Sequence, residues 1–310
     1  MERLVAVIGP TAVGKTRLSI DLAERLGTEV ISGDSMLVYR RMDIGTAKPD
    51  AAERRGIPHH LIDILEPHEE FSVVDFQAQA GRLISTINLA GRIPVLAGGT
   101  GLYVKALLEG YTFNSVEGND AIRSRLAALA DQHGSAYLHA RLQEASPETA
   151  AKLHPNDLRR IIRALEIYEL SGETVSRQRK TDGLLYDALV IGLTMSREKL
   201  YQRINQRVDI MMEMGLVDEV SRLLKEGVPP DSQAMQGIGY KEIAAYLKGE
   251  SSLPEAIDRL KQATRNFAKR QMTWYRRMNY VEWVNVDEFP DYEKMLGYIY
   301  SLVAGKFNLE

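Results

Sequence analysis

Short apolar runs rich in β-branched residues recur along the chain, and between most of them the apolar positions follow helical spacing. Several runs are bounded by glycine, proline or asparagine, as buried strands often are. The runs occupy Leu4–Ile8, Glu29–Ser32, His60–Ile64, Ile93–Ala97, Ala188–Thr194 and Tyr280–Val286. Alternating strands and helices predict an α/β fold with a doubly wound parallel sheet, in which ligands bind at the carboxyl ends of the strands.

The alternation breaks once, between Ser115 and Lys180, where the pattern is helical and contains no strand-like run. Capping residues predict helices that start at Asn119, Ser146 and Asn156. The stretch is too long for a simple crossover between strands, so it predicts a helical insertion domain. The predicted boundaries are 115–184 for the insertion, and 1–114 with 185–310 for the core.

The segment Gly9–Thr16 fills every position of the phosphate-binding pattern G-x-x-x-x-G-K-[ST], between a strand-like run and a helical pattern. Glycines let the backbone fold around an anion, so that N–H groups and a helix N-terminus point at it. Lys15 adds a positive charge, and the Thr16 hydroxyl can bind Mg²⁺. The predicted phosphate-binding residues are Gly9, Pro10, Thr11, Ala12, Val13, Gly14, Lys15 and Thr16. The pattern does not identify the phosphate compound.

A second candidate is Asp34, which follows the strand-like residues Val30 and Ile31. It is therefore predicted to lie at the carboxyl end of the sheet, close to the phosphate loop. An acidic side chain beside bound phosphate has to hold Mg²⁺ or accept a proton, because its charge is otherwise repulsive. A helix cap for the following segment explains the residue type equally well.

The carboxylate that nucleotide-hydrolysing P-loop proteins carry at the end of a core strand is missing where it is expected. The run Ile93–Ala97 ends instead in Gly98-Gly99-Thr100-Gly101, which offers backbone donors and one hydroxyl. Asp63 and Asp287 are the alternatives, and both lie in weak contexts. This asymmetry favours a site in which diphosphate is a leaving group over one in which a phosphate bond is hydrolysed.

Composition narrows the classes of protein. The chain of 310 residues has no cysteine, which excludes disulfides and thiolate zinc sites, and its six histidines form no ligand-spaced cluster. No apolar run reaches membrane-spanning length, and the phosphate loop runs through the apolar start, so we expect a cytoplasmic protein. The net charge is −3, so any nucleic-acid surface has to be local.

Local basic surfaces are present. The stretch Lys261–Arg277, inside a helix predicted from Pro254 to about Met278, carries six basic residues and no acid. A basic stretch of this kind is most often a helix face exposed to solvent. Six basic residues without an acid nearby favour the alternative, in which the stretch contacts phosphate groups. Phe267, Gln271, Trp274 and Met278 share another face of that helix.

Arginines form two further groups. Arg159, Arg160 and Arg163 lie on a helix of the predicted insertion. Arg203 and Arg207 are four residues apart on a helix that begins near Ser196, so they share a face. One of this pair can reach a diphosphate, or both are surface arginines.

Further motifs accompany these. They are Asp34–Arg40, Met42–Pro49, Gly56–His60, Gly98–Tyr103, His154–Asp157, Gln236–Lys241 and Arg265–Trp274. In this order, and with the phosphate loop, they resemble the tRNA dimethylallyltransferase family, also called tRNA isopentenyltransferases, over nearly the whole chain. The bacterial form is the one it resembles, because the C-terminal zinc finger of eukaryotic members needs cysteines that this chain lacks.

The resemblance implies transfer of a dimethylallyl group from dimethylallyl diphosphate to the exocyclic amino nitrogen of the adenine 3′-adjacent to the anticodon in tRNA. It implies that the phosphate loop and Mg²⁺ on Thr16 stabilise the diphosphate, and that Asp34 is the general base with Thr100 and Arg207 beside it. It implies a monomer that binds the tRNA anticodon stem-loop, and neither DNA nor a membrane. The implied tRNA contacts are Asp34, Ser35, Met36, Leu37, Thr100, Arg123, Arg159, Arg160, Arg163, Gln236, Gly237, Ile238, Gly239, Tyr240 and Lys241.

Three other functions stay open from the residues alone. An isopentenyltransferase for free adenine nucleotide is related, but it does not need an RNA-clamping insertion. A P-loop kinase of a small molecule would need the missing strand-end carboxylate. A non-catalytic RNA-binding nucleotide switch would leave Asp34 without a chemical role.

Overall fold

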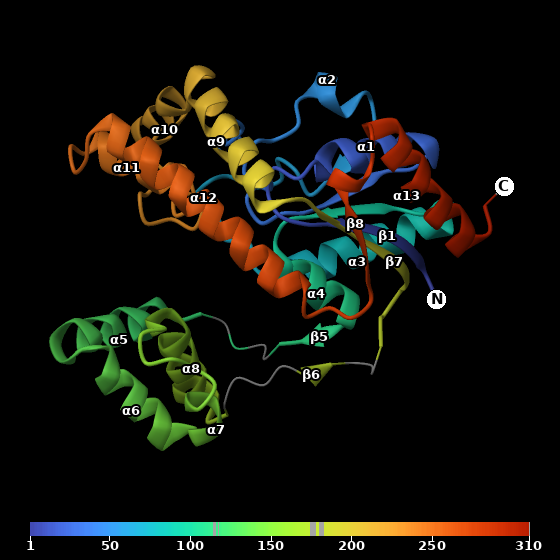
Figure 1. The fold of residues 1–310 in the computed structure, drawn as a ribbon. Helices are drawn as coiled ribbons and strands as arrows, with labels where there is room; N and C mark the ends of the chain where they lie inside the picture. Colours follow the sequence, from blue (N-terminus) through green and yellow to red (C-terminus); the bar gives the residue numbers. More distant parts are fainter. Residues whose placement is uncertain (114–115, 117, 174–177, 180–182, 310) are drawn as a thin grey trace. The chain divides into compact units, whose positions relative to one another are not determined.

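The fold was analysed in a computed structural model that describes residues 1–113, 116, 118–173, 178–179 and 183–309 (Figure 1). The chain divides into two compact units, Met1–Gly110 with Thr181–Glu310, and Tyr111–Lys180. The sequence placed the insertion at 115–184, so the division lies a few residues earlier at both ends. At the N-terminal boundary the reason is the short strand Tyr111–Thr112, which pairs with Gln178–Arg179 inside the second unit.

The first unit is built on a six-stranded sheet in the order β3-β2-β4-β1-β7-β8. Every pairing in it is parallel. The strands are β1 (Arg3–Ile8), β2 (Val30–Gly33), β3 (His59–His60), β4 (Val95–Gly98), β7 (Asp187–Thr194) and β8 (Val281–Asn285). This is the α/β fold with a doubly wound parallel sheet that the sequence predicted.

Both faces of the sheet are buried, which explains the uninterrupted apolar runs. Along β1, Leu4, Ala6 and Ile8 enter one core cluster, while Val5 and Val7 enter the other. Figure 1 shows α1 and α13 on one side of the sheet and α3 and α4 on the other. The helices of this unit are α1 (Lys15–Arg25), α2 (Ala51–Arg54), α3 (Val73–Leu89), α4 (Gly101–Glu109), α9 (Arg197–Glu213), α10 (Leu216–Lys225), α11 (Tyr240–Leu247), α12 (Leu253–Tyr275), α13 (Tyr292–Phe307) and the 3₁₀ turn η1 (Val286–Glu288).

One predicted strand was wrong in extent. The apolar run His60–Ile64 forms only the two-residue β3, His59–His60, and then turns. Leu61 and Asp63 have φ angles of 60° and 55°, a left-handed conformation that no strand accommodates. The Asp63 carboxylate accepts a hydrogen bond from Lys48 at 2.5 Å, so a polar contact and not a strand ladder sets this segment.

The second unit is helical, with α5 (Asp120–His133), α6 (Ser135–Ala145), α7 (Pro147–Ala150) and α8 (Leu158–Ser171). Asn119 caps α5 and Ser146 precedes α7, as predicted, whereas α8 begins one residue later than expected, after Asp157. The sequence missed α6 and the strand pair β5 (Tyr111–Thr112) and β6 (Gln178–Arg179). A small apolar core that includes Leu126, Leu142 and Ile161 holds the helices together.

Among the residues described, no helix combines the length and the apolar character needed to cross a bilayer.

Candidate active site

The phosphate loop joins β1 to α1 and has the backbone shape that anion binding requires. Gly9, Ala12 and Gly14 all have positive φ angles, of 146°, 66° and 112°. A Cβ atom added at Gly9 would lie 2.7 Å from the Leu193 carbonyl oxygen, so this position needs glycine. Gly14 precedes α1 without a capping side chain, which leaves the first N–H groups of the helix available to an anion.

A charged cavity of about 590 Å³ opens beside this loop. Lys15, Thr16 and Arg207 are among its lining residues, and Arg203 is not. The full lining is Gly14, Lys15, Thr16, Arg17, Ile20, Asp21, Glu24, Arg25, Glu53, Arg55, Arg207, Glu293 and Leu296. Of Arg203 and Arg207, therefore, Arg207 is the one placed to meet a ligand in the phosphate loop.

Burial shapes the charges at this cavity. It lowers the pKa of Lys15 to about 8, with Arg207 acting in the same direction and Asp34 opposing both. Burial also lowers the pKa of Arg207, which Glu53 partly offsets. The Lys15 ammonium donates a hydrogen bond to the Pro10 carbonyl oxygen at 2.7 Å. Both cations are poorly solvated, so an anionic ligand that pairs with them gains more than it would at an open surface.

Asp34 stands directly after β2, at the carboxyl edge of the sheet, as predicted. Its Oδ1 accepts the Met36 N–H at 2.9 Å, so the carboxylate closes a local turn and does not cap a helix. Burial raises the pKa of Asp34, although the Met36 N–H and the charge of Lys15 counteract it. The result is a poorly solvated carboxylate that is electrostatically coupled to the phosphate loop, which is the profile of a general base.

Thr100 lies beside Asp34, because β2 and β4 are neighbours and both end at this edge. Its Oγ1 accepts the Ser35 N–H at 2.9 Å and donates to the Ser35 Oγ at 3.2 Å. The two strand ends approach so closely that a Cβ at Gly33 would lie 3.1 Å from the Gly98 Cα. The structure thus brings Asp34, Ser35 and Thr100 together with Lys15 and Arg207 in one unit.

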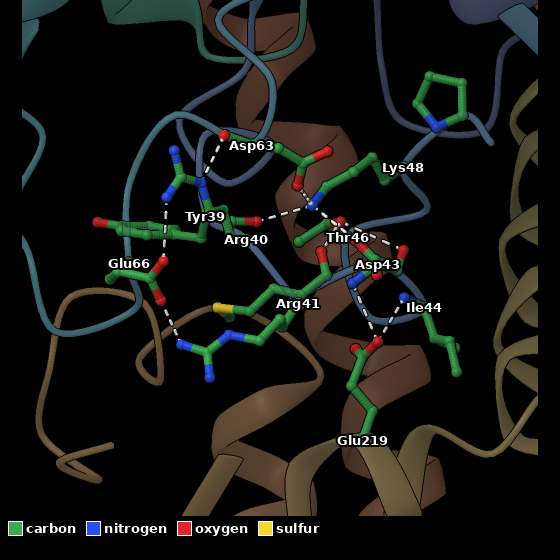
Figure 2. A network of polar contacts seen from close by, with 12 residues as sticks. Tyr39, Arg40, Arg41, Asp43, Ile44, Thr46, Lys48, Asp63, Glu66 and Glu219 are labelled. Atoms are coloured by element: carbon green, nitrogen blue, oxygen red, sulfur yellow. Dashed lines mark hydrogen bonds and ion pairs between the residues drawn. The ribbon is translucent and has the colours of Figure 1, made fainter. Parts of the chain in front are cut away.

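The segment after Asp34 is held by two buried charges (Figure 2). Glu219, on α10, is 3% exposed and accepts three successive backbone N–H groups, those of Asp43 at 3.0 Å, Ile44 at 2.9 Å and Gly45 at 3.1 Å. The Lys48 ammonium donates to the Tyr39 carbonyl oxygen and to Asp43, both at 2.7 Å. This network holds Tyr39, Asp43–Gly45 and Lys48 in place, which gives a structural reason for the motifs Asp34–Arg40 and Met42–Pro49.

The predicted tRNA contacts Gln236–Lys241 pack against the same segment. A Cβ at Gly237 would collide with the Met36 methyl group, and one at Gly45 would lie 2.6 Å from the Tyr240 ring. Tyr240 is fully buried, and its hydroxyl donates to Glu219 at 2.7 Å. Tyr240 therefore supports the loop from inside. Gln236 and Lys241 are exposed, although the Gln236 amide donates to the Pro230 carbonyl oxygen at 3.0 Å and the Lys241 ammonium lies 3.7 Å from Glu242.

We expect Glu219→Ala to lower the free energy of unfolding by about 3 kcal/mol, because three N–H groups and one hydroxyl lose their acceptor. Chemical denaturation measures the change. Glu213→Ala is the matched control, since Glu213 is exposed near the end of α9 and no described residue pairs with it. A loss no larger than that of the control would show that the loop does not depend on Glu219.

Four predicted tRNA-binding arginines lie in the second unit, and three of them are engaged. The fully buried Glu166 accepts Arg123 at 2.9 Å, Arg163 at 2.6 Å and the Asn119 N–H at 2.6 Å. Arg160 pairs with Asp157 at 3.2 Å. Arg159 is exposed, and within the described part of the chain it has no charged partner. Arg123 and Arg163 thus have a structural role that their residue type did not indicate.

The basic helix α12 divides into two halves. Lys261 pairs with Asp209 at 2.6 Å and Arg265 donates to Asn205 at 2.6 Å, so the first half is tied to α9. The C-terminal part exposes Lys269 and Arg270, and the exposed Arg276 and Arg277 follow directly after the helix; none of the four has an ion-pair partner among the residues that the structure describes. These four exposed cations form an available polyanion surface.

Metal ligands are sparse. The described residues contain no cluster of three or more histidine or acidic side chains that could cage an ion. Thr16 is exposed at the start of α1 and lines the charged cavity, so its hydroxyl fits a metal that is held mainly by ligand oxygens and water. A resident, fully protein-bound metal does not fit this site.

Known proteins resemble this chain over nearly its whole length. The family model described as IPP transferase matches residues 37–278. A tRNA dimethylallyltransferase of Bacillus velezensis is 50% identical over 310 residues, which cover 99% of this chain and 98% of that protein. The tRNA dimethylallyltransferase of Caldanaerobacter subterraneus is 46% identical over 309 residues, 98% of each chain.

Solved structures agree with these sequence comparisons. The crystal structure of the tRNA isopentenylpyrophosphate transferase of Bacillus halodurans is 48% identical and superimposes with a TM-score of 0.76, over 99% of this chain and 97% of that one. A eukaryotic dimethylallyltransferase, whose structures describe it acting on tRNA, is 30% identical with a TM-score of 0.72, over 92% of this chain and 74% of that one. The chain belongs to the IPP transferase family, with the bacterial tRNA dimethylallyltransferases as its relatives.

Proposed function

We propose that this protein is a prenyltransferase of the cytoplasm that moves the dimethylallyl group of dimethylallyl diphosphate to the exocyclic amino nitrogen of the adenine 3′-adjacent to the anticodon in tRNA. The observation that carries the proposal is the pairing of a phosphate loop with the half-buried Asp34 at one sheet edge. The tRNA dimethylallyltransferases that are 46% and 50% identical to this chain, over nearly its full length, support the choice of substrates.

The donor side of the reaction belongs to the phosphate loop. The first N–H groups of α1, Lys15 and Arg207 bind the diphosphate and neutralise the charge that grows on it as its bond to the allylic carbon breaks. The Thr16 hydroxyl would hold Mg²⁺ against the diphosphate oxygens, and the ion, when bound, supplies further positive charge there. The allylic carbon spreads the positive charge it acquires, so stabilising the leaving group is most of the activation.

The acceptor side belongs to Asp34 and Thr100. The adenine has to leave the anticodon-loop stack to reach them, which its single-stranded context eases. As its amino nitrogen forms the new bond to carbon, the nitrogen becomes strongly acidic, and the Asp34 carboxylate accepts one of its protons. The Thr100 hydroxyl, already fixed by Ser35, hydrogen-bonds the base beside Asp34. The products are prenylated tRNA, diphosphate and one proton on Asp34.

The test is an incubation with Mg²⁺ and dimethylallyl diphosphate, together with an unmodified anticodon stem-loop RNA or adenosine monophosphate. Mass spectrometry of the RNA should show one adenine that carries a five-carbon unit in place of a hydrogen. Modified mononucleotide with unchanged RNA would favour the free-nucleotide enzyme. ADP formed from ATP, with no prenyl transfer, would favour a kinase.

The two halves of α12 should differ in their effect on tRNA binding. We expect Lys269→Ala and Arg276→Ala each to weaken binding and to reduce the slope of log K against log salt by about one, because each removes a phosphate contact. Lys261→Ala is the control, since that ammonium is held by Asp209. Filter binding at several salt concentrations measures the slopes. Equal slopes for all three variants would remove α12 from the RNA surface.

A further inference from the structure

Gln271, on α12, joins two loops that the proposed reaction uses separately. Its side chain is 4% exposed. Its Oε1 accepts the N–H of Thr11, in the phosphate loop, at 2.8 Å, and its Nε2 donates to the carbonyl oxygen of Gly99, in the β4–α4 turn, at 2.7 Å. One amide therefore links the donor-binding loop to the turn that carries Thr100.

The same amide also lies close to Asp34. A Cβ atom built on Gly99 would lie 2.8 Å from the Asp34 Oδ2 and 3.3 Å from the Gln271 Nε2. The carboxylate, the glycine backbone and the amide are thus packed in one layer with no room for a side chain at Gly99. A shift of the Gly99 carbonyl would therefore move the backbone that packs against the Asp34 carboxylate.

The end of α12 contacts this turn at two more points. The Tyr275 hydroxyl donates to the Gly98 carbonyl oxygen at 3.3 Å, and a Cβ at Gly101 would lie 3.1 Å from the Trp274 side chain. The middle of the helix is tied to α9, the helix of Arg207, through Lys261 and Arg265. Among these contacts, the Gln271 amide alone reaches both the turn and the phosphate loop.

We infer that Gln271 is a positioning residue that sets the spacing between the diphosphate cradle and the Asp34–Thr100 acceptor site. This inference rests on the proposed function. In that reaction Gln271 acts through the two loops and not by contact with a substrate. Bond formation needs the allylic carbon and the adenine nitrogen held close together and in line, and a displacement of about 1 Å costs about a hundredfold in rate. A rigid link that fixes both loops from one buried atom pair meets that need.

The link requires one acceptor and one donor on the same planar group, which an amide supplies at neutral pH. A carboxylic acid has the same shape and offers the same pair while it is protonated. After ionisation both of its oxygens are acceptors. One can still accept the Thr11 N–H, but the other faces the Gly99 carbonyl oxygen without a hydrogen, and that contact becomes repulsive. Gln271→Glu therefore converts the strength of the link into a pH-dependent quantity.

The charges around the amide set the direction of that dependence. Asp34 faces it across Gly99, and Asp34 in turn is coupled to Lys15 on the phosphate loop and to Tyr275 on α12. Burial and the neighbouring Asp34 carboxylate both favour the protonated form of a carboxyl group introduced here. The link should therefore hold at low pH and fail as the pH rises.

The experiment measures kcat with anticodon stem-loop RNA and dimethylallyl diphosphate from pH 6 to pH 9, and the Kd for RNA separately. For Gln271→Glu we expect kcat to fall by about tenfold or more at the alkaline end, relative to wild type at the same pH, with a smaller loss at the acidic end. The Kd for RNA should stay within about twofold, because the basic surface is untouched. A destabilised fold without a positioning role would lower kcat at every pH alike.

Gln262→Glu is the matched control, since Gln262 is exposed on the same helix and acquires the same charge. A Gln271→Glu profile that parallels wild type, or a loss of equal size at every pH, overturns the inference. If Gln271→Glu does not fold, Gln271→Met replaces it: a lower kcat with unchanged RNA affinity supports the link, and an unchanged kcat overturns it. A wild-type protein that transfers no prenyl group refutes the proposed function instead.

Discussion

Replacing Asp34 by asparagine should lower turnover by about a hundredfold or more while tRNA still binds. Asparagine keeps the shape of the side chain, and its Oδ1 can still accept the Met36 N–H that closes the local turn. What it loses is the ability to take a proton from the adenine amino nitrogen. Single-turnover prenylation, with tRNA affinity measured separately, distinguishes this chemical defect from a binding defect.

The wild-type pH profile should report the same group. Because burial raises the pKa of Asp34, the single-turnover rate should fall as the pH decreases through a value above that of an ordinary aspartate. The acidic limb should be absent in Asp34→Asn. Near-normal turnover in that variant, or an acidic limb that survives the substitution, would remove Asp34 from the role of base.

Stability should change in the opposite direction to activity. A carboxyl group whose pKa is raised by folding stabilises the protein below its unfolded pKa, and this contribution is lost as the pH rises through the folded pKa. The ionised form of Asp34 is therefore a destabilising element, and above the folded pKa of Asp34 the Asp34→Asn variant should be as stable as wild type or more so. Asp258→Asn, at an exposed position on α12, is the control for a charge change alone.

The sequence predicted the parts of the site that depend on local pattern. The phosphate loop is a continuous motif whose glycines are needed for its own backbone, so Gly9 and Gly14 are informative without any partner. Asp34 could be placed because strand ends in a parallel sheet share one edge. Alternating positions along β1 feed two cores, so the apolar run alone indicated a strand buried on both faces.

The residues that the sequence missed are single buried polar groups with distant partners. Gln271 meets a backbone N–H that is 260 residues away, Glu219 serves a loop about 175 residues away, and Glu166 binds arginines of two helices. Each lies in an ordinary amphipathic helix, where a polar residue is expected to face solvent. Gln271 did have one indication, since it shares a helix face with Phe267, Trp274 and Met278 and not with the basic residues.

The pattern of basic residues predicted the basic surfaces only in part. A run of arginines and lysines predicts a basic surface only where no acid from another element reaches it. Arg123 and Arg163 are held by Glu166, and Lys261 is held by Asp209. Which cations remain available is therefore a property of tertiary packing, and the composition of a helix cannot supply it.

Replacing Lys15 by alanine should weaken binding of dimethylallyl diphosphate by about a hundredfold at pH 7 and leave tRNA binding intact. The ammonium lines the charged cavity and is poorly solvated, so its contact with a diphosphate is a strong, charge-assisted one. Isothermal titration with the donor and filter binding with RNA measure the two affinities. Lost RNA binding with unchanged donor affinity would mean that the loop has been assigned to the wrong substrate.

The wild-type protein should also show a pH dependence of donor binding that belongs to Lys15. Burial lowers the pKa of Lys15 to about 8 in the free protein, and the negative charge of a bound diphosphate raises that pKa again. Binding above pH 8 then takes up a proton, so the donor Kd should be flat below about pH 8 and should rise by about tenfold per pH unit above it. Proton uptake can be measured directly from titrations in buffers that differ in ionisation heat.

Lys15→Arg is the control, because a guanidinium stays charged throughout this range and should show no break at pH 8. A break of the same size in Lys15→Arg would assign the titration to another group at the cavity, and the proposed donor-binding role of the Lys15 ammonium would then rest on the alanine variant alone.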